Sequence, residues 1–577
     1  MIILVNLFFN RFHLKNYISL SLLGLFSFLS IAQNAETEGD SIINVIAGYQ
    51  RIIEDKYPGA IIYASSDSQE VYVEHNGIKM WCDQAIFYKK DNFLRALGKV
   101  RMNQGDSVFM NSKYAEYNGN TKLAFASGKV KMRSPDTHLE TDTLYFDRTK
   151  QQAYYRSGGK VTDTASVLTS RVGRFFMQEK KYQFLDHVII THPDYTINSA
   201  QVNFYTETGH AYLYGPSTIK GETSTVYCER GFYDTRKDYG HFVKNSRIDY
   251  NNRTVTGDSL FFNRVTNFAS ATNHIIVTDT INKSIIKGHY AEVYRDKDSV
   301  FITKRAVAIS VQEQDSVYIH ADTLMVTGPE DNRIIRGFRD VRLFKSDLSG
   351  RCDSIYTRQS TGLTKMIKKP VLWSGKSQIT GDSIHLQSNV ETERLDSLRV
   401  FYNAFVINKD TILDNAYDQI KGKELKGYFK DNELHKVKMD KNVENVLYVK
   451  DEDKELIGIN KGTSSKLEVT FRNGDVAIIK PIMSSKDETI PPEEFPENAR
   501  RLRGFNWREE EKLYSIDDLF KGKPIPQLTK IEGLPLPKIE DAFFDENNSS
   551  EINENSRLDK ELLINKKEDQ QVIGKKS

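Results

Sequence analysis

A motif that returns about every thirty residues constrains this chain more than any other feature. Its clearest copy is Gly257-Asp258-Ser259-Leu260, a small residue followed by an acid, a polar residue and an apolar residue. Between the last residues of successive copies, the steps are 29, 30, 28, 30, 29, 29, 33, 31, 31, 29 and 41 residues. Independent domains do not produce such steps, so we expect one repeat array of about twelve units. The other close copies end at Leu144, Leu324, Ile355 and Ile384, and looser copies end at Ala85, Tyr114, Val172, Val202, Gly231, Val293 and Leu425, with a degenerate copy near Leu467.

Each repeat also carries an upstream strand of the form glycine-x-valine. Gly98-Lys99-Val100-Arg101-Met102 and Gly128-Lys129-Val130-Lys131-Met132 show it best, and Gly159-Lys160-Val161 is a third case. Apolar and polar residues alternate in these runs, which is typical of a strand with one buried face. The 29 Tyr and 31 Phe also favour strands over helices. The sequence therefore predicts an all-β array.

The alternation changes phase inside the motif, and this change predicts a bend. The positions five and three residues before the end of a copy share one strand face, whereas the final residue falls at odd spacing from both. We therefore expect each strand to bend or bulge at the acidic residue, so that stacked repeats enclose a continuous apolar trough. Gly288 and Gly350 interrupt this pattern. The side chains predicted to line the trough are Met80, Phe87, Phe109, Leu139, Phe146, Val167, Ile197, Phe204, Val226, Val255, Phe262, Ile319, Ile379 and Ile420, for which packing in a filled core is an equally good explanation.

The N-terminus has the pattern of an export signal. Arg11, His13 and Lys15 precede an apolar run from Tyr17 to Ala32, and Ser30-Ile31-Ala32 supplies the small-x-small pattern of a cleavage site. Residues 1–32 are thus expected to be removed between Ala32 and Gln33. The alternative is an uncleaved inner-membrane anchor that uses the second apolar stretch, Ile2 to Phe9.

Composition divides the remaining chain into four parts. Residues 33–250 and 251–480 are the two halves of the array, residues 481–537 are a proline-rich segment, and residues 538–577 are a charged tail expected to be disordered. The proline-rich segment contains the basic and aromatic run from Arg500 to Arg508, which we expect to fold back on the array or to engage a partner. We expect this segment to be irregular or helical.

Little in the sequence indicates catalysis. Twelve histidines show no metal-ligand spacing, and the recurring aspartates are expected to stabilise a turn, with calcium binding as the alternative. Cys82, Cys228 and Cys352 occupy the same small position in distant copies, so we expect unpaired thiols. A formal net charge of +2 argues against a nucleic-acid binder. We expect a protein that is not an enzyme and uses no cofactor or metal.

The repeats resemble the OstA family of organic solvent tolerance proteins, which includes LptA, LptC and the N-terminal domain of LptD. The resemblance rests on the repeated glycine-x-valine strands, above all Gly98-Lys99-Val100-Arg101-Met102-Asn103-Gln104-Gly105, and covers roughly residues 40–470. It implies an elongated open β-jellyroll, or β-taco, that shields lipopolysaccharide acyl chains in the periplasm. Because the chain ends in a polar tail, it departs from the family member that carries an outer-membrane barrel, and is better interpreted as a bridge or an accessory.

From this resemblance we expect a periplasmic carrier, associated with the outer membrane, that binds lipopolysaccharide or a related glycolipid in the trough. Other bridge proteins and the outer-membrane translocon would join by edge-strand addition. Lys99, Lys129 and Lys160 are predicted to line a rim that meets phosphates, unless they form a solvated face. A secreted structural or adhesive β-solenoid and a polysaccharide-active solenoid enzyme remain the alternatives.

Overall fold

We describe the protein from a computed structural model. The structure describes residues 43–534, apart from residues 76, 105–107, 134–136, 163–165, 223, 251, 264, 282, 298, 312–314, 330–331, 393, 431–432, 452, 454, 473–474 and 484–485. The predicted export signal, its alternative anchor and the charged tail lie outside the described residues. Within residues 43–534, no helix combines the length and apolar character needed to span a bilayer.

The structure is built almost entirely of β-strands. The strands of the first third are β1 (Asn44–Ile46), β2 (Tyr49–Arg51), β3 (Ala60–Ala64), β4 (Val71–His75), β5 (Ile78–Cys82), β6 (Gln84–Tyr88), β7 (Phe93–Gln104), β8 (Val108–Asn118), β9 (Leu123–Arg133), β10 (His138–Asp147), β11 (Gln152–Tyr155), β12 (Gly159–Thr162), β13 (Val167–Ser170), β14 (Val172–Phe176), β15 (Lys181–His192) and β16 (Tyr195–Tyr205).

Longer strands dominate the rest of the array. They are β17 (His210–Gly221), β18 (Ser224–Asp234), β19 (Tyr239–Tyr250), β20 (Arg253–Asn263), β21 (Phe268–Asp279), β22 (Ser284–Tyr294), β23 (Ser299–Ser310), β24 (Val317–Thr327), β25 (Ile334–Lys345), β26 (Leu348–Arg358), β27 (Leu363–Ile367), β28 (Val371–Ser374), β29 (Ser377–Thr380), β30 (Ser383–Ser388), β31 (Leu395–Lys409), β32 (Tyr417–Lys430), β33 (Glu433–Lys450), β34 (Leu456–Arg472), β35 (Asp475–Ile482) and β36 (Lys486–Ile490). Short 3₁₀ turns are η2 (Arg295–Lys297), η3 (Gln359–Thr361), η4 (Glu497–Ala499), η5 (Glu509–Glu511) and η6 (Ile516–Phe520).

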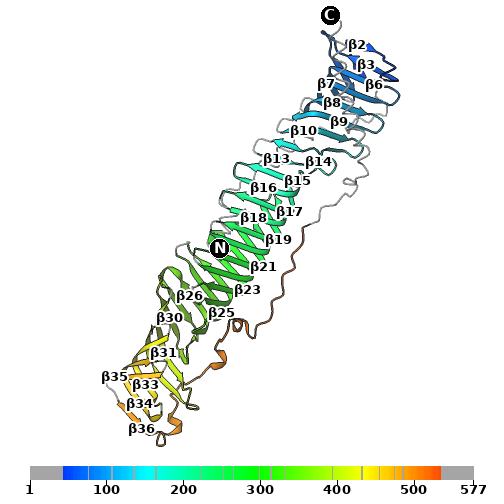
Figure 1. The fold of residues 1–577 in the computed structure, drawn as a ribbon. Helices are drawn as coiled ribbons and strands as arrows, with labels where there is room; N and C mark the ends of the chain where they lie inside the picture. Colours follow the sequence, from blue (N-terminus) through cyan, green and yellow to red (C-terminus); the bar gives the residue numbers. More distant parts are fainter. Residues whose placement is uncertain are drawn as a thin grey trace. The chain divides into compact units, whose positions relative to one another are not determined.

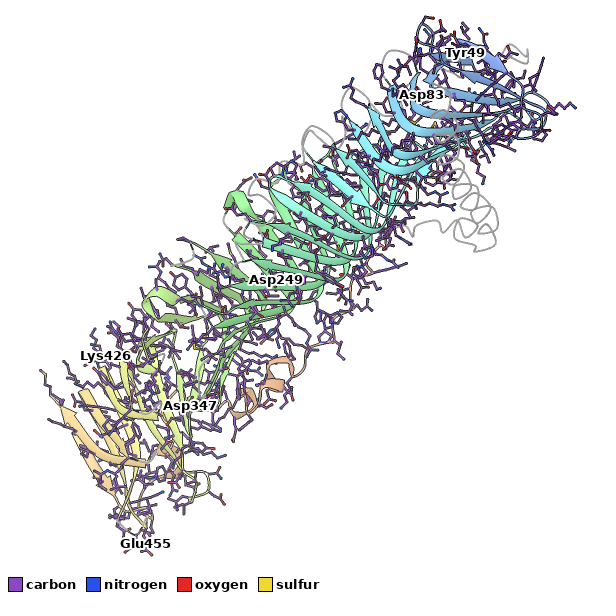
Figure 2. The ribbon with its side chains drawn as sticks, turned by 45° about the horizontal axis from the view of Figure 1, so that its top comes forward. Tyr49, Asp83, Asp249, Asp347, Lys426 and Glu455 are labelled. Carbon is purple, nitrogen blue, oxygen red and sulfur yellow. The ribbon has the colours of Figure 1, made fainter. Side chains whose placement is uncertain are left out.

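Antiparallel pairing between neighbouring strands joins the array into one stack that follows chain order (Figure 1). The pairing continues through the turn between β19 and β20, where the sequence division at residue 250 falls. In Figure 2 the strands are curved, so that the sheet folds around its own inner face. The prediction of an elongated all-β jellyroll array is therefore confirmed.

A repeated bulge bends the long strands at their middle. In β19, Lys244 and Asn245 both adopt left-handed backbone conformations, with φ of 65° and 56°, and both face the single residue Asp258 of β20. Two residues opposite one is the geometry of a β-bulge, and it turns the strand. The bend predicted at the acid is therefore present, but its extra residue belongs to the upstream strand, at the glycine and lysine of the glycine-x-valine pattern.

The bulges correct the register of three copies. Gly98 and Lys99 face Lys113, which places the end of that copy at Ala115 instead of Tyr114. By the same criterion the copies assigned to Val172 and Val293 end at Gly173 and Ala291. Gly288 then occupies the position three residues before the end of its copy, where small residues are usual, and it is no longer an exception. At Gly350 the missing side chain leaves space that Met366 fills, since a Cβ there would lie 2.8 Å from its terminal carbon.

The bends divide the sheet into two walls, each with one inward ladder of directly paired residues. The first wall is the half that carries Met80, Met102, Met110, Met132, Leu139, Val161, Leu168, Ile190, Ile197, Ile219, Val226, Ile248, Val255 and Val277. The second wall is the half that carries Phe87, Leu94, Tyr117, Ala124, Phe146, Ala153, Phe175, Tyr182, Phe204, Ala211, Tyr233, Gly240, Phe262 and Ala269. Hairpin turns at the strand ends form the lips of the trough.

Residues 491–533 form a strap that folds back over the outer face of the first wall. Buried Phe495 and Leu502 pack against Phe405 and Ile407, which flank the inward Val406 and therefore face outward. Further along, the strap contacts β25 through η6, and in Figure 1 it runs back beside β25 and β23. The basic and aromatic run thus contacts the array of its own chain.

Three amide side chains of the array hold the backbone of the strap. Gln419 donates to the Arg500 carbonyl at 2.7 Å and accepts from the Leu502 amide at 2.8 Å. Gln378 makes the same pair of bonds with the Asn506 carbonyl and the Arg508 amide, at 2.8 and 2.7 Å. Asn273 repeats the arrangement on both backbone groups of Thr529, at 2.9 and 3.0 Å. These side-chain amides therefore satisfy backbone groups of the strap that a strand would pair with a neighbouring strand.

Candidate functional site

The interior of the trough is filled along its second half. Inward side chains between Val226 and Phe471 form one buried cluster, in which the exposed fractions of Ile248, Phe262 and Val300 are 0%, 6% and 0%. Both walls contribute to this cluster, so they meet through their side chains. In this segment the side chains of the two walls pack against each other, as in an ordinary protein core.

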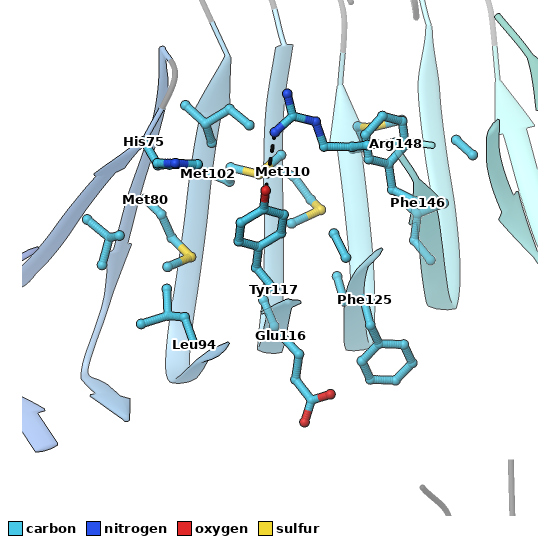
Figure 3. A pocket seen from close by; sticks show the side chains of 18 of the residues that line it. His75, Met80, Leu94, Met102, Met110, Glu116, Tyr117, Phe125, Phe146 and Arg148 are labelled. Carbon is cyan, nitrogen blue, oxygen red and sulfur yellow. Dashed lines mark hydrogen bonds between the residues drawn. The ribbon is translucent and has the colours of Figure 1, made fainter. Parts of the chain in front are cut away.

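The first third of the trough is different, because it encloses a cavity of about 180 Å³ (Figure 3). An engineered cavity of about 150 Å³ holds one benzene molecule, so this cavity has room for a short apolar group and not for several chains at once. A smaller cavity of about 40 Å³ follows it, lined by Leu139 and Phe184 among others. The lining of the larger cavity consists mainly of Ile43, Val73, Ile78, Met80, Leu94, Met102, Val108, Met110, Ala115, Ala124, Ala126, Met132, Leu144, Phe146 and Ala153.

Four methionines stand at the centre of the first-wall side of the cavity, together with Val73 and Val108. Met80, Met102, Met110 and Met132 are direct partners across β5, β7, β8 and β9, so they stand in one unbroken row. From Leu139 onward the same ladder continues with Leu, Ile and Val through β21. Methionine is unbranched, flexible and polarizable, and therefore adapts to partners of varied shape. The methionine row coincides with the region where the trough is hollow.

The mouth of the cavity carries polar side chains. His75 ends β4 at the lip of the first wall, and Tyr117 stands near the lip of the second wall. Their ring centroids are 5.8 Å apart, so the pair spans the mouth. Arg148, in the turn after β10, donates from its guanidinium to the Tyr117 hydroxyl at 3.3 Å, the bond drawn in Figure 3. An apolar interior with a cationic, hydroxylated mouth suits an amphiphile.

Most of the side chains predicted for the trough are found inside it. Twelve of the fourteen belong to the buried clusters or pack against them: Met80, Phe87, Leu139, Phe146, Ile197, Phe204, Val226, Val255, Phe262, Ile319, Ile379 and Ile420. Of these, Met80 and Phe146 line the larger cavity and Leu139 lines the smaller one. The remaining members pack in the core around or beyond the cavities.

Phe109 and Val167 were wrongly placed by the sequence. Phe109 is half-exposed and lies under the guanidinium of Arg133, between the buried Val108 and Met110. Val167 is likewise only partly buried, beside the buried Leu168. Both errors follow from the one-residue register shifts described above, because a shift of one residue moves a side chain to the opposite face of a strand.

The three lysines predicted to line the rim do not share one environment. Lys99 and Lys129 are exposed bulge residues, with φ of 38° and 60°, at the bend of their strands and far from the strand ends that form the lips. Lys160 lies past its bend, paired with Glu140 and Thr169. We find no common rim in this geometry.

Acidic residues at the bends of the strands form local ion pairs. Asp258 binds His274, a bulge residue of β21, at 2.8 Å, and Asp353 binds Lys368, in the link between β27 and β28, at 3.3 Å. Within the described residues, no group of three or more His, Cys, Asp and Glu side chains is placed to hold a metal ion. Cys82, Cys228 and Cys352 are free and buried, as predicted, and burial raises the pKa of each thiol to about 12. Such thiols are unreactive at neutral pH.

The sequence reasoning missed most of the cavity lining. Met102, Met110 and Met132 were absent from the predicted set, as were Tyr117 and Arg148. The signal for the methionines was present, since Met102 and Met132 follow Val100 and Val130 by two residues in both clear glycine-x-valine strands. No sequence pattern marked Arg148, because its position follows from the turn after β10.

Comparison with known proteins finds a family match over the segment that carries most of the cavity lining. Residues 55–200 match the family described as OstA-like protein. Among solved structures, one match is the crystal structure of LptH, the LptA homologous periplasmic component of the conserved lipopolysaccharide transport device from Pseudomonas aeruginosa. It is 12% identical, covering 30% of this chain and 81% of that chain at a TM-score of 0.08, which is too low to carry an argument. No curated protein matches the sequence. The resemblance to the OstA family is confirmed for residues 55–200, which match the family model and contain the cavity lining apart from Ile43.

Proposed function

We propose that this protein is a periplasmic lipid carrier that holds acyl chains of lipopolysaccharide, or of a related glycolipid, in the hollow first third of its trough and helps to move them to the outer membrane. The observation that carries this proposal is the methionine-lined cavity inside the OstA-like region. Each buried methylene contributes about 0.8 kcal/mol, so an acyl chain gains substantially from a dry trough.

The filled half supports a second role within the same molecule. Residues 226–471 have a closed core and a strap braced along the outer wall, features that suit a rigid spacer or scaffold. The lipid-binding role is therefore proposed for the first third, and the second half would set the reach of the carrier and present surfaces to bridge proteins or the translocon. Catalysis forms no part of this proposal.

Size limits what the cavity holds in this conformation. About 180 Å³ accepts part of one acyl chain, so a lipid with several chains requires the two walls to separate. Separation would begin at the mouth, where the walls meet through the rings of His75 and Tyr117. We expect the trough to widen when it is loaded.

Photo-crosslinking with lipopolysaccharide tests the proposal. A benzophenone side chain at Met110 faces the cavity, whereas the same group at the neighbouring Phe109 faces outward on the same strand. A third probe at Phe262 samples the filled half. Adducts at Met110 alone are expected. Equal labelling at Met110 and Phe109, or adducts confined to Phe262, would contradict a carrier function for the first third.

A further inference from the structure

The mouth of the cavity contains an arginine, Arg148, for which the described part of the chain shows no ion pair with an acid. Arg148 is half-buried, and among the described residues its side chain bonds only the Tyr117 hydroxyl. Two other arginines of this region are paired with carboxylates. Arg95 binds Glu116, which also lines the cavity, at 3.2 Å, and Arg101 binds Glu70. A guanidinium donates up to five N–H groups, so Arg148 keeps donors for a ligand.

The position of this guanidinium matters as much as its charge. Arg148 lines the same cavity as Met110 and Phe146, so one group of a ligand can touch the arginine while its remainder contacts the apolar lining. Tyr117 joins the two regions, because its ring lies in the second-wall ladder and its hydroxyl reaches Arg148. Figure 3 shows the bond between Arg148 and the Tyr117 hydroxyl, with the hydroxyl beside Met102 and Met110.

We propose that Arg148 and Tyr117 form a head-group subsite that selects an amphiphile with an anionic head, phosphate or carboxylate, whose acyl chain lies along the methionine row. This proposal rests on the carrier function above and adds the residues that read the head group. An anion would bind the guanidinium and accept from the Tyr117 hydroxyl, replacing the long bond between them. Charge-assisted hydrogen bonds of this kind are about twice as strong as neutral ones, and a partly desolvated arginine is suited to phosphate geometry.

The contact between Tyr117 and His75 gives the subsite a second consequence. An anion inserted between Arg148 and the Tyr117 hydroxyl would displace the Tyr117 ring, which contacts the ring of His75 across the mouth.

Binding of two matched amphiphiles to the full-length protein separates the head group from the chain. Decyl phosphate and decanol carry the same tail, and both are measured by equilibrium dialysis below their micelle concentrations, with inorganic phosphate as a third ligand. The test variant is Arg148→Met. The control is Arg236→Met, an arginine in a turn after β18 at the same lip, where the trough is filled.

We expect Arg148→Met to weaken the affinity for decyl phosphate at least tenfold and to change the affinity for decanol by less than twofold. Arg236→Met should change neither affinity. Tyr117→Phe should cause a smaller, head-group-specific loss, and Arg148→Lys should restore part of the affinity. An equal loss for both amphiphiles, or no loss, overturns the subsite. Inorganic phosphate that binds as tightly as decyl phosphate overturns it in favour of a free-anion site. If neither amphiphile binds the unmodified protein, the carrier function itself fails, whereas decanol binding without any gain from the phosphate removes the subsite alone.

Discussion

The attachment of the strap depends on two fully buried glutamines, and Gln378 offers the sharpest test. Its side chain is 0% exposed and bonds both the Asn506 carbonyl and the Arg508 amide. In Gln378→Leu the leucine has similar size but neither a donor nor an acceptor, so both backbone groups of the strap lose their partner. A buried unpaired group costs about 1–3 kcal/mol, and each lost bond about 0.5–1.5 kcal/mol. We expect a local destabilisation of about 2–4 kcal/mol.

The loss is limited by release of the strap, because a detached strap regains water as its hydrogen-bond partner. Native-state hydrogen exchange of the peptides that contain Leu502 and Arg508 measures this step directly. Exchange should accelerate by at least thirtyfold in Gln378→Leu, since about 1.4 kcal/mol corresponds to a factor of ten. Limited proteolysis within residues 491–533 should accelerate in parallel.

A matched control separates the strap contact from a general effect of removing an amide. Gln387 is exposed in β30 and bonds the Thr361 carbonyl away from the strap, so Gln387→Leu should leave exchange in the strap unchanged. The double variant Gln378→Leu/Gln419→Leu should lose less than the sum of the single losses if release is concerted. Unchanged protection at Arg508 in Gln378→Leu would refute the reasoning.

Two further predictions concern the array itself. Burial raises the pKa of Asp418 to about 6, although the bond that its carboxylate accepts from the Tyr448 amide acts in the opposite direction, so the stabilising contribution of Asp418 is complete below about pH 4 and is lost as the pH rises through 6. In denaturant titrations, Asp418→Asn should remove this pH dependence of the unfolding free energy, which is at most about 3 kcal/mol. A pH dependence that the variant retains would assign it to other groups. Gly98→Ala should destabilise the first third by about 1–3 kcal/mol, because φ at Gly98 is 73° and the new Cβ would lie 2.3 Å from an Asp83 carboxylate oxygen. The control Gly77→Ala, with φ of 77° and open space around the new Cβ, should show only the cost of the backbone conformation. Equal losses of stability in thermal unfolding would contradict a steric role for Gly98 at the bend.

The errors in the predicted site have one physical origin. The spacing of the repeats favours the large Tyr114 as the end of its copy, although the bulge at Gly98 and Lys99 assigns that role to the small Ala115. Periodicity near thirty tolerates a shift of one residue, but side-chain direction in a strand does not. Phe109 was therefore assigned to the wrong face while Met110 was missed. Only the strand pairing seen in the structure shows how many residues each bulge contains.

The sequence by itself determined the all-β repeat array, the bend in the strands and the unpaired cysteines. Each of these features follows from a local pattern that recurs from copy to copy and depends only on neighbouring strands. The sequence left two matters open that the tertiary structure decided. Whether the trough is hollow depends on the distance between two walls, and an apolar ladder is the same for a filled and an empty interior. Whether the basic and aromatic run contacts its own chain depends on Gln378 and Gln419, residues more than eighty positions away from their strap partners. Contacts over such separations form only when the array is assembled, so no local pattern could have recorded them.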